Sequence, residues 1–284
     1  MIPSTHYQAF HRNLAFRRPS RWITVAAAAG AAAIAMSGCS KGSTGTAANN
    51  PALKQIKLAA DTSAHVNSLT ASLSVHSVGS HAGGLTGTIQ MQMKPTTLIE
   101  AKFNVAAASS PSIHLDEILT GQAIYFKDPA FAKSAGKPWV KVRISQLSSK
   151  SGISFGSLLQ NLEGSNPLDQ TRLFTASKDV RVVGTQTIDG VPTTEYAGTY
   201  APQTAYAGLT SHMRKLLGPM LRSIGTHPVH FHVWIDAQHM IKQADDTESV
   251  RGQTVTTTFT VTSVNQPVSV MLPKTGQTAP LPHL

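Results

Sequence analysis

The chain has 284 residues and a mass of 30.1 kDa, with 41% hydrophobic and 13% charged residues. This is enough apolar material for a folded core and too little charge for an intrinsically disordered protein. A mean hydropathy of −0.07 argues against a polytopic membrane protein. The single cysteine excludes an internal disulfide, a cysteine-built zinc site and an iron–sulfur cluster.

The formal net charge of +10 does not indicate nucleic-acid binding. Part of it lies in residues 1–39, which carry four arginines and no acidic residue. Beyond residue 40 the basic residues are scattered, with no run of Lys and Arg interleaved with aromatic residues. We therefore expect no nucleic-acid partner.

The N-terminal segment has the order of a secretory signal peptide that ends in a lipoprotein processing site. A basic stretch, 11–21, precedes an Ala-rich apolar stretch, 22–36, which is shorter than the ~20 residues of a membrane-spanning helix. Ser37 and Gly38 then leave room for cleavage before Cys39, whose thiol would be linked to diacylglycerol. The alternative is an uncleaved N-terminal anchor with an incidental cysteine.

This pattern divides the chain into four parts. Residues 1–38 are expected to be the signal peptide, and residues 39–50 a lipidated tether, because Ser, Gly, Thr, Ala and Asn make a flexible linker. The folded domain is expected at 51–273, followed by an irregular tail at 274–284. Acyl chains on Cys39 would hold the domain on the outer face of the cytoplasmic membrane.

Hydrophobic periodicity predicts the elements of the domain in chain order. Apolar residues three to four positions apart predict a helix that begins after Pro51 and ends near Asn67. The period then changes to two, which predicts strands at 69–75, 85–93, 98–105, 113–119, 123–127 and 139–144. Phe155, Leu158, Leu159 and Leu162 predict a short helix, and a helical turn is expected from Pro167 to Phe174.

The second half continues with strands at 180–187, 193–200, 229–236, 240–250 and 254–264. Asp189-Gly190 predicts a tight hairpin, since both positions tolerate a positive φ. Strands and crossover helices do not alternate, so a parallel nucleotide-binding sheet is not expected. The sequence predicts an α+β fold, a curved antiparallel sheet with helices on one face.

The helix expected from Thr204 to Ile224 is the candidate ligand-binding element. Gly218-Pro219 in its middle predicts a kink or break. The apolar stripe either closes a packed core or forms a deformable lid over a ligand cavity, because Met side chains adapt to irregular apolar ligands. The residues of this stripe are Leu209, Met213, Leu216, Leu217, Met220 and Leu221.

Two clusters of polar residues are weighed as sites. His230 and His232 would share one strand face near His227, and Asp246 and Glu248 would share another face near Asp245. Neither cluster has a complete ligand set at fixed spacing, so both are interpreted as exposed faces rather than metal, calcium or acid–base sites. No P-loop, dinucleotide fingerprint, zincin motif or nucleophile elbow occurs.

Short motifs in a fixed order resemble the actinobacterial LppX/LprG-type lipoproteins, which are themselves similar to periplasmic LolA carriers. The motifs are Leu85-Thr86-Gly87, Lys137-Pro138-Trp139-Val140, Ile188-Asp189-Gly190-Val191 and Val233-Trp234-Ile235-Asp236, after the processing site at Cys39. The resemblance implies an antiparallel half-barrel whose concave face, closed by helices, carries lipid or glycolipid acyl chains in the cell envelope. It brings no catalytic residue.

The resulting expectation is a lipid-anchored carrier of acyl chains without enzymatic activity, metal or cofactor. Its ligand would be a lipid or glycolipid, and an envelope protein is a possible further partner. A sensor or interaction module on the same fold is the alternative. An extracellular hydrolase is disfavoured, because the sequence offers no nucleophile–base pair.

Overall fold

The computed structural model describes residues 50–79, 82–107, 110–127, 129, 133, 135–143, 167–250 and 252–280. Cys39 and the predicted signal peptide lie outside the described residues. So does the short helix predicted at 155–162.

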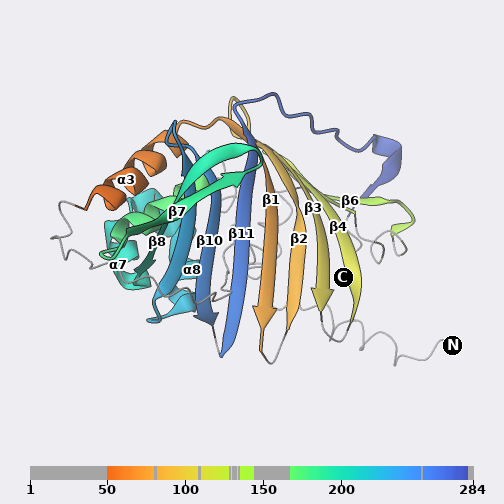
Figure 1. Ribbon diagram of the computed structural model, residues 1–284. Coiled ribbons are helices and arrows are strands. Elements are labelled where there is room, and N and C mark those ends of the chain that lie inside the picture. The colour runs from red at the N-terminus through yellow and green to blue at the C-terminus, as the bar shows by residue number, and fades with distance from the viewer. Residues whose placement is uncertain are drawn as a thin grey trace.

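The described strands form one open, curved sheet (Figure 1). The strands of its first half are β1 (Ser68–Val78), β2 (Gly83–Gln92), β3 (Leu98–Ala107), β4 (Ser110–Thr120), β5 (Ala123–Lys127) and β6 (Trp139–Arg143). Those of its second half are β7 (Arg181–Ile188), β8 (Val191–Tyr200), β9 (Val229–Asp236), β10 (Ile241–Val250) and β11 (Gln253–Val264). A short strand, β12 (Thr278–Pro280), adds to the outer edge of the first half. The spatial order is β12-β6-β5-β4-β3-β2-β1-β11-β10-β9-β8-β7.

Each half is a meander of neighbouring antiparallel strands, and the β1–β11 pair joins the two halves. The hairpin predicted at Asp189-Gly190 is confirmed, with φ values of 47° and 79° between β7 and β8. The expected curved antiparallel sheet is present, but the sheet is mixed, because β12 pairs with β6 in parallel.

That parallel pair corrects the prediction of an irregular C-terminal tail. Thr275–Gln277 form a short 3₁₀ helix, η4, and Thr278–Pro280 form β12 on the edge strand β6. The Pro-rich sequence gave no strand pattern over so few residues. The strand forms because β6 offers an unpaired edge of backbone donors and acceptors.

The helices gather on the concave face of the sheet, over the half that contains β7 to β10 (Figure 1). They are α3 (Pro51–Ser63), η3 (Pro167–Ala176), α7 (Pro202–Gly208) and α8 (Ser211–Ile224). Asn50 caps α3, because its side-chain oxygen accepts hydrogen bonds from the backbone N–H groups of Ala52 and Leu53 at 2.9 and 3.2 Å. Helix η3 is the helical turn predicted after Asn166.

The single helix predicted from Thr204 to Ile224 is two helices, and the break predicted at Gly218-Pro219 is absent. Helix α8 runs through both residues, and the chain breaks instead at Leu209, which has an extended backbone. Thr210 then caps α8 by accepting a hydrogen bond from the N–H of Met213 at 3.3 Å. A local cap at Thr210 therefore determines where the chain breaks between α7 and α8. Gly218 makes room for the ring of Tyr206, because a Cβ at this position would lie only 3.0 Å from that ring.

Side chains from these helices and from β8 and β9 form the largest buried cluster. Its centre is aromatic, with the ring of Phe174 stacked on that of Phe231 at 4.4 Å between centroids. Gly198 leaves room for this stack, because a Cβ there would lie 2.9 Å from the Phe231 ring. The sheet face that bears this cluster is called the inner face below.

Candidate functional site

The inner face continues beyond the helices as an apolar surface across the first half of the sheet. Cross-strand register places Val75, Leu85, Val105 and Ile113 side by side on β1, β2, β3 and β4. A neighbouring row consists of Leu73, Gly87, Phe103 and Leu115.

Much of this surface is only half-buried. Leu85, Phe103 and Val105 are intermediate in exposure, and Ile113 is 49% exposed. Helices α3, α7 and α8 all lie over the other half (Figure 1). Leu73, Val75 and Leu115 of the same two rows are buried, so the partly exposed surface is limited to β2, β3 and the start of β4. A partly exposed group of apolar side chains is a candidate binding surface.

The predicted ligand-binding stripe lies in and just before α8, which packs over β10. Leu209, Met213, Leu217 and Leu221 are buried in the cluster around Phe231. Leu216 and Met220 belong to the same helix, and their side chains are outside the described part of the molecule. Burial of the four side chains fits both a packed core and a cover over a ligand, so their role as ligand contacts stays a prediction.

The acidic residues of β10 were interpreted from the sequence as an exposed face, and for Asp246 and Glu248 this interpretation is wrong. Asp246 and Glu248 share a face as predicted, but that face is the inner one, since Asp246 lies opposite Phe231 in the β9–β10 register. Glu248 is only 4% exposed. The interpretation as a solvated face holds for neither residue, because strand alternation does not say which side the helices cover.

Burial raises the pKa values of Asp246 and Glu248. It raises the pKa of Glu248 to about 8 and that of Asp246 to about 7, and in each case a neighbouring carboxylate adds to the effect. Both carboxyls also help to raise the pKa of the buried Tyr200 phenol. One oxygen of each carboxyl, Oδ1 of Asp246 and Oε2 of Glu248, is buried without a hydrogen-bond partner.

A third carboxyl lies on the inner face of the other half. Glu117 of β4 stands opposite Ala101 of β3 and Phe126 of β5. Burial raises the pKa of Glu117 to about 7. The sequence analysis did not single out this residue, although a lone acid among alternating apolar residues was a signal.

His230 and His232 lie on the opposite, outer face of β9, and His227 lies in the bend before that strand. His227 and His230 are exposed, and His232 Nδ1 lies 2.6 Å from Glu195 Oε1. Asp245 points to this same side, opposite His232 in the register. Across the described ranges, no group of three His, Cys, Asp or Glu side chains could hold a metal ion. Spacing alone could not reveal Glu195, because β8 and β9 meet only in the sheet.

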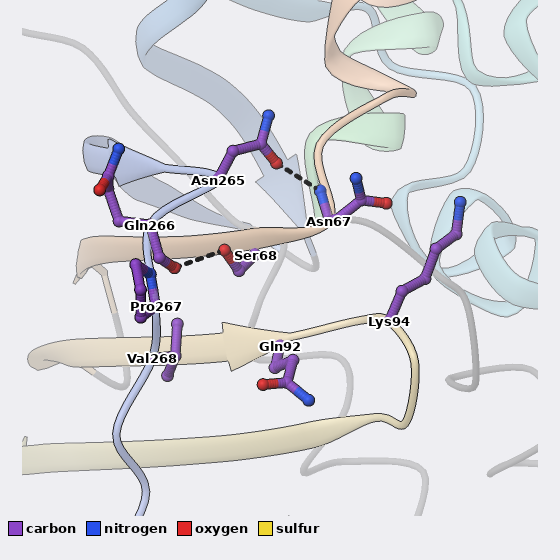
Figure 2. Close-up of a pocket in the computed structure, with 8 residues that line it drawn as sticks. All are labelled: Asn67, Ser68, Gln92, Lys94, Asn265, Gln266, Pro267 and Val268. Carbon is purple, nitrogen blue, oxygen red and sulfur yellow. Dashed lines mark hydrogen bonds between the residues drawn. The ribbon is translucent and has the colours of Figure 1, made fainter.

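Two pockets lie at the margins of the sheet. The first has a volume of about 270 Å³ and is lined by Asn67, Ser68, Gln92, Lys94 and the segment after β11 (Figure 2). Within it, Ser68 Oγ donates to the carbonyl of Gln266 at 2.7 Å. These amides, the hydroxyl and the ammonium group suit a polar ligand, not an acyl chain.

The second pocket, of about 630 Å³, lies between α3 and the β7–β8 hairpin. Thr185, Thr187, Thr193 and Thr194 provide much of its lining, with Gln55 from α3. Neither pocket contains the predicted ligand-binding residues of α8. The partly exposed apolar rows on β2 to β4 lie outside both pockets.

Every helix in the described ranges falls short of the length and apolar character that a membrane crossing needs. No protein-family model matches the chain. A protein of Streptomyces griseus, described as an uncharacterized 31.2 kDa protein in the rplA–rplJ intergenic region, is 27% identical over 156 residues. The match covers 50% of this chain and 48% of that protein, so it spans about half of the relative.

The fold is similar to that of a solved structure, LprF. LprF from Mycobacterium bovis superposes with a TM-score of 0.51 and 14% sequence identity, over 78% of this chain and 96% of LprF. The lipoprotein LppX of Mycobacterium tuberculosis is also similar, with 17% identity and a TM-score of 0.42 over 78% of this chain and 98% of LppX. The superposition with LprF confirms the expected curved-sheet, LppX-like fold at the level of architecture.

Proposed function

We propose that this protein, which has the fold of LprF, is a cell-envelope lipoprotein that binds and carries the acyl chains of a lipid or glycolipid. The observation that carries the proposal is the half-exposed apolar row Leu85, Val105 and Ile113 on the concave side of the sheet. Burying such side chains against an acyl chain yields about 25 cal/mol per Å² of apolar surface. Binding of this kind needs no catalytic group.

Anchoring through Cys39 is part of the same proposal. The basic segment, the apolar segment and Ser37-Gly38-Cys39 occur in the order that lipoprotein processing requires. Cys39→Ala should release the mature protein from the membrane fraction. If the variant stays in the membrane as firmly as the parent, the apolar segment itself is the anchor.

Copurified lipid tests the carrier function. The mature chain with Cys39→Ser is extracted with organic solvent, and the extract is analysed by mass spectrometry. We expect lipid in the parent and its loss in Ile113→Asp, because a carboxylate on the apolar row repels an acyl chain. Val183→Asp is the control, since Val183 on β7 is also 49% exposed. Equal lipid content in both variants, or none in the parent, would contradict the proposal.

The stripe of α8 is tested separately. If Met213 covers the ligand, Met213→Glu should fold with a modest loss of melting temperature and lose lipid. If Met213 only completes the core, where it is 6% exposed, a buried charge should cost several kcal/mol and prevent folding. Met220→Glu is made in parallel. Variants that fold and retain parental lipid would exclude the helix as a lid.

A protein-interaction module on the same fold is the second candidate. Strand β7 is the edge of the described sheet, and its Val182 and Val183 are 58% and 49% exposed. Exposed apolar side chains on a sheet edge favour pairing with a strand of a partner. This candidate predicts that Val182→Asp abolishes a protein interaction and leaves lipid content unchanged.

A further inference from the structure

The buried carboxyl pair and the half-exposed apolar patch belong to one continuous row. Asp246 of β10 lies opposite Thr257 of β11, which lies opposite Val75 of β1. From Val75 the same row reaches Leu85 and the strands beyond it. At about 4.8 Å between strands, the five steps from β10 to β4 span roughly 24 Å, the scale of an extended acyl chain.

The pair stands at the covered end of that row. Helix α8 packs over β10, and the neighbouring inner-face residues on β9 are Phe231 and Val233. Glu248 is 96% buried there, since only 4% of its surface is exposed. The row is thus buried from β11 to β1, where Thr257 and Val75 are 6% and 8% exposed, and partly exposed from β2 to β4.

The enclosed end has unused hydrogen-bonding capacity. Oδ1 of Asp246 and Oε2 of Glu248 are buried acceptors without a partner in the described structure. Leaving a buried acceptor unpaired destabilises the folded state, whereas an apolar residue of similar shape would not. A ligand that brings the missing hydrogen-bond donors would remove this cost.

From this arrangement we propose that Asp246 and Glu248 form the polar end of the acyl-chain site and bind a hydrogen-bond-donating group, a hydroxyl or an amine, at one end of the ligand. The inference rests on the proposed function and specifies its ligand class. A hydroxyl or ammonium group supplies donors to the two free oxygens. A terminal carboxylate or phosphate is expected to bind more weakly, because it brings no donor to the two free oxygens and its own charge loses its water in the site.

Three probes of equal chain length test this preference by titration calorimetry on the mature chain with Cys39→Ser: decanol, decylamine and decanoate. We expect decanol, decylamine or both to bind at least about tenfold more tightly than decanoate, the value of one good buried hydrogen bond. Preference for decanol identifies the hydroxyl as the recognised group, and preference for decylamine identifies the amine.

Glu248→Met removes the acceptor and keeps the length of the side chain, so it should abolish the preference among the probes. Glu195→Met is the matched control, because Glu195 lies on the outer face beside His232, and it should retain the parental preference. The Glu248→Met protein should also melt at a higher temperature than the parent at pH 8, since an unpaired buried acid is removed. A lower melting temperature would indicate a structural role.

The outcomes separate the two proposals. If all three probes bind equally, or if Glu248→Met keeps the parental preference, the polar end is overturned while acyl-chain binding stands. If decanoate binds best, the assigned ligand class is wrong. If none of the probes binds to the parent, acyl-chain binding itself fails, and the polar end fails with it.

Discussion

Over β8 and β9 the inner face of the sheet is covered by helices, and Phe231 and Val233 are 1% and 0% exposed. Over β2 to β4 the same face carries Phe103 and Val105 in a half-buried state and Ile113 at 49% exposure. Both regions have the same alternation of apolar residues. The difference indicates that one half of the sheet supplies most of the buried core and the other supplies surface that a ligand can cover.

The two halves also differ in what limits substitution. In the helix-covered half, side chains from different elements interlock around the Phe174–Phe231 stack. In the half formed by β1 to β6, the backbone of β2 approaches that of β3 closely at Gly87. Substitutions can therefore separate damage to the core from damage to the binding surface.

The largest effect is expected at Gly87. A Cβ at this position would overlap the carbonyl oxygen of Lys102 and lie 2.6 Å from the ring of Phe103, so Gly87→Val should prevent folding or cost several kcal/mol. Gly184→Ala is the control, because nothing lies within 4 Å of a Cβ at that strand position. Thermal unfolding of both variants checks this, and a fully stable Gly87→Val protein would contradict the register of β2 and β3.

Phe231→Ala should have the next largest effect, about 3 to 5 kcal/mol of unfolding free energy, because it removes a buried ring from the aromatic cluster. Phe103→Ala provides the comparison in the other half and should cost less, since Phe103 is only half-buried. Chemical denaturation measures both. Equal losses would mean that the two halves are packed alike, against the distinction drawn above.

Stability should depend on pH through Glu248. Because its pKa is raised from 4.5 to about 8, the folded state binds more protons than the unfolded state between these values, and stability falls as pH rises through this window. The free energy of unfolding of the parent should differ between pH 5 and pH 8, and Glu248→Gln should reduce that difference by about 1 to 3 kcal/mol. Denaturation of parent and variant at both pH values tests this, and identical pH dependence would contradict it.

The smallest effect is expected on the outer face. Glu195→Gln breaks the pair with His232, whose side chain is 45% exposed, and should change stability by less than about 1 kcal/mol. It should also leave copurified lipid unchanged, because the outer face takes no part in acyl-chain binding. A large loss of lipid in this variant would indicate that the ligand binds on the outer face, which would contradict the proposal.

The sequence by itself determined most elements, because local physics governs them. Strand alternation identified all of the long described strands, and Asp189-Gly190 identified the β7–β8 turn through its positive φ values. The position of the helix break was predicted wrongly. Helix α8 continues through Gly218-Pro219, and the break lies at Leu209, after which Thr210 caps α8. Strand β12 was missed, because its three residues depend on the free edge of β6.

Which face of each strand is buried follows from how the strands and helices pack in the folded sheet. Period two places Asp246 and Glu248 together, but an alternating pattern is symmetric between the two sides of a sheet. The register with Phe231 and the position of α8 place the pair inside, while Asp245 and His232 face outward. The β1–β11 pair likewise joins segments far apart in sequence, so the row from Asp246 to Ile113 exists only in the folded sheet.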